Sequence, residues 1–273
     1  MYTISDEDYW NILKERISAV TGFNADQYSE KFVKRRTECR MRIKKMVSYS
    51  NYAKLLLKDK KEVEELHKIL TIHVTHLFRD ASMFGVLQNK VLPEIINVNK
   101  SYTKNPIIRI WSAGCATGEE PISVLISILE KFGTDTKLFF SIRGSDIDPD
   151  SIKKAKVGIY ENIQFKETKG FLIRKYFEKK ETSYSIKDEY KHYINYKVGD
   201  ITKDTQSGLD IIMCRNTVIY FHSETKKKLY KSFFTALNPG GFLILGKTET
   251  LLGESMDSYD VYDLKERIYR KPL

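Results

Sequence analysis

Hydrophobic and polar positions divide the chain into two stretches with different periods. Up to about residue 80, apolar residues recur every three or four positions, which is the spacing of amphipathic helices. From residue 106 onward, short apolar runs alternate with helical patterns. Runs of strand length fall at 107–112, 138–145, 194–199, 209–215 and 241–246, and helical patterns fall near 121–131, 149–157 and 223–237. This alternation predicts an α/β fold with a mainly parallel, doubly wound sheet.

Two segments depart from plain alternation. Residues 259–264 and 267–271 are strand-like and have no helix between them, so we expect one of them to run antiparallel. Residues 178–197 are polar, tyrosine-rich and strand-prone, which predicts a small inserted β-hairpin. We therefore expect an all-α domain over 1–80, a connecting helix and linker over 81–105, and the α/β domain over 106–273.

The first predicted strand leads into a glycine-containing loop and then a helix, in the sequence SAGCATGEEP at 112–121. Gly114 and Gly118 permit the positive φ of a tight loop, and Pro121 suits the first turn of a helix. In an open α/β sheet, such a loop places a ligand at the carboxyl ends of the strands. The glycines are spaced GxxxG, not GxGxxG as in a dinucleotide fingerprint. Taken alone, the loop fits an ordinary strand-to-helix turn equally well.

Polar residues also end two further strands. Asp146 follows the second apolar run, where a carboxylate can accept hydrogen bonds from both ribose hydroxyls of an adenine nucleoside. The glycine loop and Asp146 together indicate a nucleoside cofactor without saying which one. Arg215 and Asn216 end the run at 209–215 and would face the same crevice, with Tyr220 close behind. The alternative is a turn asparagine and a core tyrosine.

The net charge of +10 over 273 residues predicts an acidic partner, which could be nucleic acid, an anionic membrane or an acidic protein surface. Cations concentrate in the predicted helix at 26–47, where Glu38 is the single anion between residues 31 and 45. A solvated helix face and a docking surface both fit this segment. Its cations are Lys31, Lys34, Arg35, Arg36, Arg40, Arg42, Lys44 and Lys45.

The cysteines and histidines indicate neither disulfides nor a metal. Cys39, Cys115 and Cys214 are far apart and lack CxxC spacing, which favours a reducing, cytoplasmic compartment. His73 and His76 could share a helix face, but we expect no metal site there. No apolar run approaches the roughly 18 residues of a membrane span, and the acidic start of the chain does not resemble a secretory signal. We expect a cytoplasmic protein without membrane insertion.

Four ordered motifs resemble those of the CheR family, the chemotaxis receptor glutamate methyltransferases. They are THLFR at 75–79, WSAGCATGEEP at 111–121, SDID at 145–148, and CRN at 214–216 followed by IYF at 219–221. The resemblance covers nearly the whole chain, and an antiparallel last strand is usual in class I S-adenosylmethionine (SAM) methyltransferases. It implies an enzyme that methylates glutamate side chains on chemoreceptor helices and releases S-adenosylhomocysteine (SAH), without a metal.

The resemblance also implies the residues of the site. The residues that would hold SAM are His73, Thr75, Arg79, Gly114, Glu120, Asp146, Asp200, Ile201, Arg215 and Asn216. Of these, Asp146 would hold the ribose, and Asp200 with Ile201 would border the adenine. His73 and Asp200 stand where the family often has Asn. Arg79 and Tyr220 would lie nearest the transferred methyl group and orient the acceptor carboxylate.

In the family, the second N-terminal helix contacts the receptor. The resemblance therefore implies Arg35, Arg36, Arg40 and Arg42 as docking residues. Some members also hold a receptor C-terminal pentapeptide through a glycine-bearing loop of the inserted hairpin. Residues 178–197 contain no glycine, so we expect no dependence on the pentapeptide. Nothing in the sequence demands a dimer, and we expect a monomer.

Other classes of protein remain as alternatives. A nucleic-acid methyltransferase would share the fold and the basic charge, but it needs an Asn/Asp-Pro-Pro-aromatic motif where this chain has RNTV at 215–218. An NAD-dependent oxidoreductase fits the GxxxG loop and the antiparallel tail poorly. A non-catalytic SAM-binding adaptor would keep the cofactor residues without turnover.

Overall fold

The computed structural model describes residues 5–71, 74–102, 107–133 and 139–273. They fall into two compact units. Of the described residues, the helical unit comprises 5–71 together with Tyr220–Thr225, and the sheet unit comprises the others.

The helical unit contains α1 (Asp6–Thr21), the 3-10 helix η1 (Ala25–Gln27), α2 (Glu30–Ile43), α3 (Tyr49–Leu56) and α4 (Lys60–Leu70). A capping box starts α1, because Ser5 and Asp8 each accept the backbone N–H of the other. The basic helix α2 is shorter than the 26–47 expected. It is preceded by an extended Ser29 and ends before Lys45, which has a φ of 55°. The core of the unit is built from Trp10, Leu13, Ile17, Phe32, Val33, Met41, Tyr52, Leu66 and Leu70.

A seven-stranded sheet with the order β6-β2-β1-β7-β8-β10-β9 forms the centre of the sheet unit. Its strands are β1 (Ile107–Ala113), β2 (Phe139–Asp146), β6 (Ile194–Val198), β7 (Leu209–Cys214), β8 (Leu237–Leu245), β9 (Asp260–Asp263) and β10 (Ile268–Arg270). The first five in this order pair in parallel, and β10 runs antiparallel to both β8 and β9. The predicted fold class, including its antiparallel tail, is confirmed.

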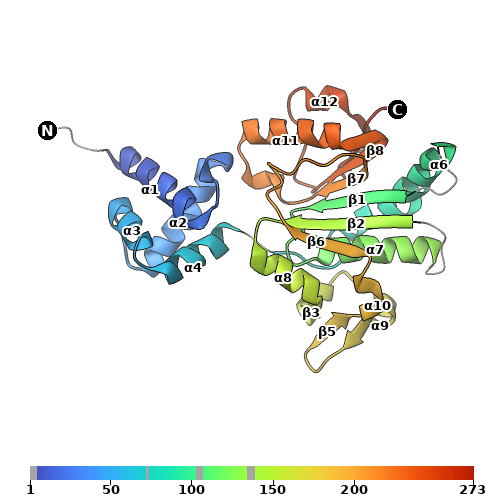
Figure 1. Ribbon diagram of the computed structural model, residues 1–273, viewed down its shortest axis with the longest axis horizontal. Helices are drawn as coiled ribbons and strands as arrows, with labels where there is room; N and C mark the ends of the chain where they lie inside the picture. Colours follow the sequence, from blue (N-terminus) through green and yellow to red (C-terminus); the bar gives the residue numbers. More distant parts are fainter. Residues whose placement is uncertain (1–4, 72–73, 103–106, 134–138) are drawn as a thin grey trace. The chain divides into compact units, whose positions relative to one another are not determined.

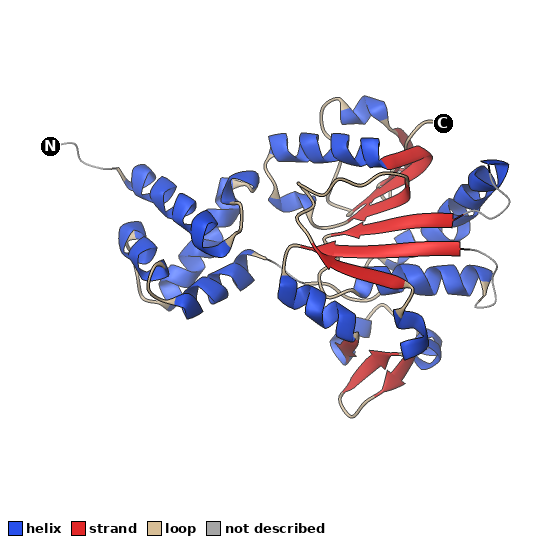
Figure 2. Cartoon of the chain, viewed as in Figure 1, coloured by secondary structure: helices blue, strands red, loops and turns tan. Residues whose placement is uncertain are grey.

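Helices cover both faces of this sheet (Figures 1 and 2). They include α7 (Glu119–Phe132) after β1, α8 (Pro149–Val157) after β2 and α11 (Ser223–Ala236) after β7. From the centre, the chain moves outward toward β6 through α7 and α8, and in the other direction toward β8 through α11. Right-handed crossovers then place α11 on the opposite face. Accordingly, the ring centres of Phe233 in α11 and Trp111 in β1 lie 5.6 Å apart. Ile108 and Ile110 of β1 instead belong to the hydrophobic core that contains α7.

The strand order reverses between β1 and β7, and in open α/β sheets ligands bind at such a point, beyond the carboxyl ends of the strands. The fold thus locates the candidate site.

The helical segment that precedes β1 in the chain consists of α5 (Ala81–Val86), the π-helical η2 (Leu87–Val91) and α6 (Leu92–Tyr102). We expected a connecting helix here. Its buried residues, among them Phe84, Leu87 and Ile95, belong to the same core as β1 and α7, so the segment is a layer of the sheet unit.

The inserted subdomain is larger than a hairpin. It is a three-stranded antiparallel sheet of β3 (Ile159–Glu161), β5 (Ser183–Ile186) and β4 (Phe177–Lys179), with η3 (Asn162–Phe165), α9 (Gly170–Tyr176) and α10 (Asp188–Lys191). It begins near residue 159, after Gly158 ends α8 with a φ of 68°. The expected bounds of 178–197 were therefore wrong at both ends, since Ile194–Val198 pairs with β2 in the main sheet.

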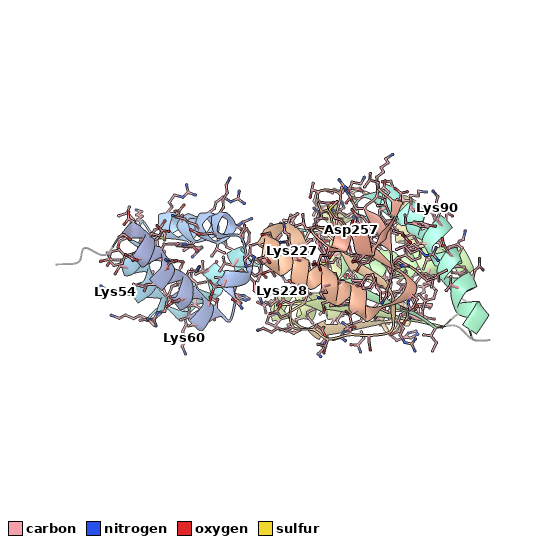
Figure 3. The ribbon with its side chains drawn as sticks, turned by 90° about the horizontal axis from the view of Figure 1, so that it is seen from above. Lys54, Lys60, Lys90, Lys227, Lys228 and Asp257 are labelled. Atoms are coloured by element: carbon pink, nitrogen blue, oxygen red, sulfur yellow. The ribbon has the colours of Figure 1, made fainter. Side chains whose placement is uncertain are left out.

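The start of β8 and the short helices after β7 and β8 complete the fold. β8 begins at Leu237, before the expected range of 241–246, and residues 238–241 lie within it, where the register with β7 shifts. The short helices η4 (Val218–Tyr220) and α12 (Ser255–Ser258) follow β7 and β8. Lys227 and Lys228 of α11 are exposed (Figure 3), whereas Leu229 and Tyr230, which follow them, are buried.

Among the described helices, none combines the length and the apolar character needed to cross a membrane.

Candidate functional site

Polar loops follow all five parallel strands at the carboxyl edge of the sheet. The glycine loop 114–118 follows β1, Asp146 ends β2, and Asp200 follows β6 closely. Arg215 and Asn216 follow β7, and a Gly-Lys-Thr-Glu segment at 246–249 follows β8. The sheet therefore gathers at one edge Gly114, Asp146, Asp200, Arg215 and Asn216, which are five of the residues that the sequence placed in the cofactor site.

The glycine loop is packed too tightly to accept side chains at its glycines. Gly114, Ala116 and Gly118 have φ values of 81°, 47° and 94°. The N–H groups of Gly114 and Cys115 donate to the carbonyl of Ser145 at 2.8 and 2.9 Å, which joins the loop to β2. A Cβ on Gly114 would lie 2.6 Å from the hydroxyl of Thr217. Glycine is thus required by both conformation and space.

Asp146 is fixed in place by backbone amides. Its side chain is largely buried. Its Oδ2 accepts from the backbone N–H of Ala116 at 2.9 Å, and its Oδ1 accepts from the backbone N–H of Asp148 at 3.0 Å. Asp148 in turn caps α8 through the N–H groups of Asp150 and Ser151. The carboxylate therefore has a set orientation between the glycine loop and α8.

Arg215 is the centre of a buried ionic network. Its side chain is only 3% exposed. Nη1 donates to Glu120 at 3.1 Å, and Nη2 donates to both the Asp80 carboxylate and the Arg79 carbonyl at 2.7 Å. The other Glu120 oxygen accepts from Ser112 Oγ at 2.7 Å. Three predicted site residues, Arg79, Glu120 and Arg215, are therefore brought together.

The loop that carries Arg79 has a strained backbone. Phe78 and Asp80, on either side of Arg79, have φ values of 56° and 60°. Non-glycine residues rarely adopt such values, and they persist only when surrounding contacts fix them. The Arg79 side chain is half-buried, with its Nη1 donating to the carbonyl of Val74 at 2.8 Å. Thr75 is half-buried in the same loop.

Three residues from other parts of the chain, Gln164 of η3, Ser123 of α7 and Glu167, hold this loop by hydrogen bonds. The N–H of Leu77 donates to the carbonyl of Gln164 at 2.8 Å, and the N–H of Phe78 donates to Ser123 Oγ at 2.8 Å. Glu167 binds His76 Nε2 at 2.8 Å and accepts from the N–H of Ala81 at 3.2 Å. Burial raises the pKa of Glu167, but these two partners outweigh it and hold the pKa below its usual range.

The turn after β6 begins beside Asp146, because the N–H of Gly199 donates to the Asp146 carbonyl at 2.9 Å. Asp200 uses one carboxylate oxygen within its own turn, accepting from the N–H and the hydroxyl of Thr202 at 3.0 and 2.7 Å. Its other oxygen lies 3.6 Å from Lys203 Nζ. Ile201 is buried. His73 lies outside the described residues.

Glu249 is a functional candidate that sequence reasoning missed. It is 3% exposed, and its Oε2 accepts from the N–H groups of Gly246 and Asn216 at 2.6 and 2.8 Å. Its Oε1 accepts from the N–H of Ile219 at 3.1 Å. Burial raises the pKa of Glu249, while these amides act in the opposite direction. The available signal was a carboxylate soon after a buried strand, as at Asp146.

Asn216 is adjacent to this network and has an unsatisfied acceptor. Its φ is 57°, and its Oδ1 is buried without a hydrogen-bond partner among the described residues. An unpaired buried acceptor is costly and commonly marks a place where a ligand or ion binds. Together with the fixed carboxylate of Asp146 and the close-packed glycine loop, it makes the residues present suitable for a nucleoside cofactor that carries donor groups.

Cysteine chemistry is not favoured at this edge of the sheet. Burial raises the pKa of Cys115 and of Cys214 well above the ordinary thiol range, so both stay protonated at neutral pH. In the described ranges, no group of three or more His, Cys, Asp or Glu side chains is arranged to hold a metal.

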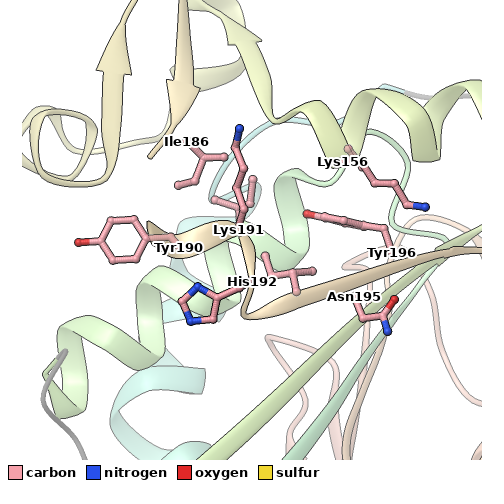
Figure 4. A pocket seen from close by; sticks show the side chains of 10 residues that line it. Lys156, Ile186, Tyr190, Lys191, His192, Asn195 and Tyr196 are labelled. Atoms are coloured by element: carbon pink, nitrogen blue, oxygen red, sulfur yellow. The ribbon is translucent and has the colours of Figure 1, made fainter. Parts of the chain in front are cut away.

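A separate cavity of about 370 Å³ lies between α8, α10 and the beginning of β6. Its lining includes Lys156, Lys191 and His192, but Figure 4 shows these three side chains pointing in different directions. They do not converge on a common anion. Tyr196 connects this cavity to the glycine loop by donating to the carbonyl of Gly118 at 3.3 Å.

Tyr220 and the predicted docking arginines belong to the helical unit. The Tyr220 carbonyl accepts from the N–H of Ser29 at 2.9 Å, and its ring centre lies 4.9 Å from that of Phe32. Arg35 and Arg42 are exposed on α2. Arg36 is half-buried, with its guanidinium 5.8 Å from the centre of the Phe32 ring.

Arg40 differs from the other three arginines because it is buried. Its Nε donates to Glu62 Oε1 at 2.9 Å, and its Nη2 donates to Oε2 at 2.5 Å. Glu62 is completely buried and also accepts from the Tyr52 hydroxyl at 2.7 Å. The Arg40 guanidinium is therefore committed to the core of the helical unit, and the docking interpretation applies to Arg35, Arg36 and Arg42.

Comparison with known proteins agrees with this arrangement. The CheR methyltransferase all-alpha domain matches residues 9–71, and the CheR methyltransferase SAM binding domain matches residues 73–268. The chain is 31% identical to a chemotaxis protein methyltransferase of Listeria innocua over 92% of both chains. It is 28% identical to chemotaxis protein methyltransferase 2 of Vibrio cholerae, over 91% of this chain and 87% of that protein. The chain therefore belongs to the CheR methyltransferase family and has both its all-α domain and its SAM-binding domain.

Proposed function

We propose that the protein transfers the methyl group of SAM to glutamate side chains in the cytoplasmic helices of chemoreceptors, forming methyl esters. The observation that carries the proposal is the buried Arg215 network, which brings the Arg79 loop to Glu120 at the point where the strand order reverses. The relatives named as chemotaxis protein methyltransferases support the receptor as the substrate.

Bound SAM supplies an electrophilic methyl group on a sulfonium. In our proposal, Asp146 accepts hydrogen bonds from the ribose hydroxyls, and Asp200 and Ile201 border the adenine. Thr75, Arg79 and Glu120 hold the methionine end, and the unpaired Asn216 Oδ1 accepts from a donor of the cofactor. His73, Gly114 and Arg215 complete the pocket.

The acceptor needs no general base. A glutamate with a pKa of about 4.3 is already ionised at neutral pH, so the protein has to orient it and exclude water. Positioning of this kind can contribute roughly 7–11 kcal/mol to lowering a barrier. We assign the orienting role to Arg79 and Tyr220. Arg79 suits this role because its guanidinium is half-exposed and donates to a neutral carbonyl, which a substrate carboxylate can replace.

Three arginines of α2, of which Arg35 and Arg42 are exposed and Arg36 is half-buried, are proposed to contact the acidic surface of the receptor. Arg35, Arg36 and Arg42 form this docking set. We further propose that the protein acts as a cytoplasmic monomer and methylates receptors that lack a C-terminal pentapeptide.

The test is methyl transfer to receptor-bearing membranes. The protein is incubated with methyl-labelled SAM and these membranes, and the label is then treated with mild base. Base-labile label on the receptor is the expected result, because a carboxyl methyl ester hydrolyses under these conditions. Measurable SAM binding without label on the receptor would contradict the proposal and favour a non-catalytic adaptor. Label on added RNA instead would indicate a nucleic-acid methyltransferase.

A further inference from the structure

We propose that Glu249 is a positioning residue of the cofactor pocket, whose carboxylate holds residues 216–219 in the conformation that presents the Asn216 side chain. This inference rests on the proposed function only in taking the carboxyl edge of the sheet as the cofactor site. Glu249 itself is not proposed to touch SAM or the substrate.

The first argument is the number of backbone amides that one carboxylate collects. Both oxygens of Glu249 act as acceptors, toward the N–H groups of Gly246, Asn216 and Ile219. These amides come from two different strand ends, because Gly246 follows β8 while Asn216 and Ile219 follow β7. Glu249 thereby joins the two loops side by side at the edge of the sheet.

The second argument is the strain in the loop that Glu249 holds. Asn216 has a φ of 57°, a value that a non-glycine residue keeps only when its surroundings fix it. The hydrogen bond from its own N–H to Glu249 is such a fixing contact. If the bond is lost, the backbone at Asn216 is free to relax, and the side chain moves with it.

The third argument is the close approach that the arrangement needs. A Cβ on Gly246 would lie 2.7 Å from the backbone nitrogen of Asn216 and 2.7 Å from Glu249 Oε2. Glycine at this position leaves room for the carboxylate to reach both loops. The carboxylate, the glycine and the strained asparagine therefore form one packed arrangement.

Two substitutions of Glu249 distinguish the effect of its two acceptor oxygens from the effect of its side-chain length. Glu249→Gln keeps the size but replaces one acceptor oxygen by an NH₂ donor, which must then face a backbone N–H. Glu249→Asp keeps two acceptor oxygens on a shorter side chain. Glu254→Gln is the matched control, since Glu254 is an exposed carboxylate five residues further along the chain.

The experiment uses the full-length protein and measures the dissociation constant of SAH by calorimetry. We expect Glu249→Gln to weaken SAH binding by about tenfold or more, because a buried N–H is left facing a donor. Glu249→Asp should be intermediate, and Glu254→Gln should equal the wild type. SAH binding by Glu249→Gln within about twofold of the wild type would overturn the proposal.

Hydrogen exchange separates a local effect from general unfolding. In Glu249→Asp, amides of the segment 214–221 should exchange faster while those of β1 and β2 keep their protection. Unchanged exchange in 214–221 would overturn the proposal, even if Glu249→Gln does not fold. A wild-type protein that binds no SAH would instead contradict the proposed function, so the two failures are distinguishable.

Discussion

Arg215 donates a hydrogen bond to the backbone carbonyl of Arg79, but the two guanidinium groups have different surroundings. The Arg215 side chain is 3% exposed and is neutralised by Asp80 and Glu120. A second anion would have to displace one of these buried partners, which is costly. Arg79 is half-buried, and its guanidinium donates to the carbonyl of Val74. Arg215 is therefore suited to holding the site together, and Arg79 to meeting a substrate carboxylate.

This difference predicts the effect of Arg79→Ala. Loss of the guanidinium removes the donor that we propose orients the acceptor, so we expect the kcat for receptor methylation to fall by about a hundredfold. The affinity for SAH should change much less. Methyl transfer to receptor membranes and calorimetry with SAH measure the two quantities. The control is Arg174→Ala, which removes an exposed arginine of α9. Unchanged turnover in Arg79→Ala would exclude the orienting role.

At the scale of secondary structure, buried strands could be predicted because they are continuous apolar runs. β1, β2 and β7 fall within one or two residues of the predicted ranges. The strands of the inserted sheet, β3 and β4, are three residues long and carry no detectable period. The predicted range of 241–246 missed the start of β8 at Leu237, because Gly240, with a φ of 75°, lies within the strand where its register with β7 shifts.

The residues of the candidate site could also be predicted only in part from the sequence. Residues in recognisable motifs, such as Asp146 and Arg215, could be placed at the crevice from the sequence. Glu167 and Glu249 were missed. The position of Glu249 soon after a buried strand is only a weak signal, and the amides of Ala81 and Asn216 that the two carboxylates bind lie about 30 to 90 positions away in the chain. The burial of Arg40 was also hidden, since its partner Glu62 lies on another helix. A contact between distant segments leaves no local pattern.

The Arg40–Glu62 pair predicts how the helical unit responds to substitution. Removing one partner of a buried ion pair leaves the other uncompensated, so Glu62→Gln should destabilise the unit by about 3–5 kcal/mol. The measurement is the free energy of opening of α2 and α4, from hydrogen exchange of the full chain. Glu64→Gln, at an exposed position of α4, is the control and should have little effect.

The pH dependence of this effect has a definite sign. Burial raises the pKa of Glu62, but hydrogen bonds from Arg40, Tyr52 and Lys44 outweigh it and hold the pKa below its usual range. A lowered pKa stabilises the fold at pH values above the ordinary glutamate pKa of about 4.3, and this contribution is lost as the pH falls through the folded-state pKa. The difference between wild type and Glu62→Gln should therefore shrink as the solution is acidified. A difference that is constant with pH would contradict this assignment.

At the scale of the whole molecule, the net charge of +10 favours association with an acidic partner but does not say which surface binds. The arginines of α2 are proposed to be that surface. Lysines are spread over both units, including Lys54 and Lys60 in the helical unit and Lys90 and Lys228 in the sheet unit (Figure 3). If attraction is general, removing equal charge from any part of the surface should weaken receptor binding equally. If the α2 arginines form a specific docking face, removing charge there should weaken binding more than removing it elsewhere.

Combined replacement of Arg35, Arg36 and Arg42 by Gln tests the docking face. We expect the KM for the receptor to rise by about tenfold and its dependence on salt to weaken, because contacts between exposed charges are screened by ions. The kcat should stay near the wild-type value, since these residues are proposed to bind the substrate without taking part in methyl transfer. The matched control replaces Lys54, Lys60 and Lys61, which are exposed in the same unit, by Gln. A similar rise in KM for both triple variants would show that net charge, not the α2 surface, brings the receptor to the enzyme.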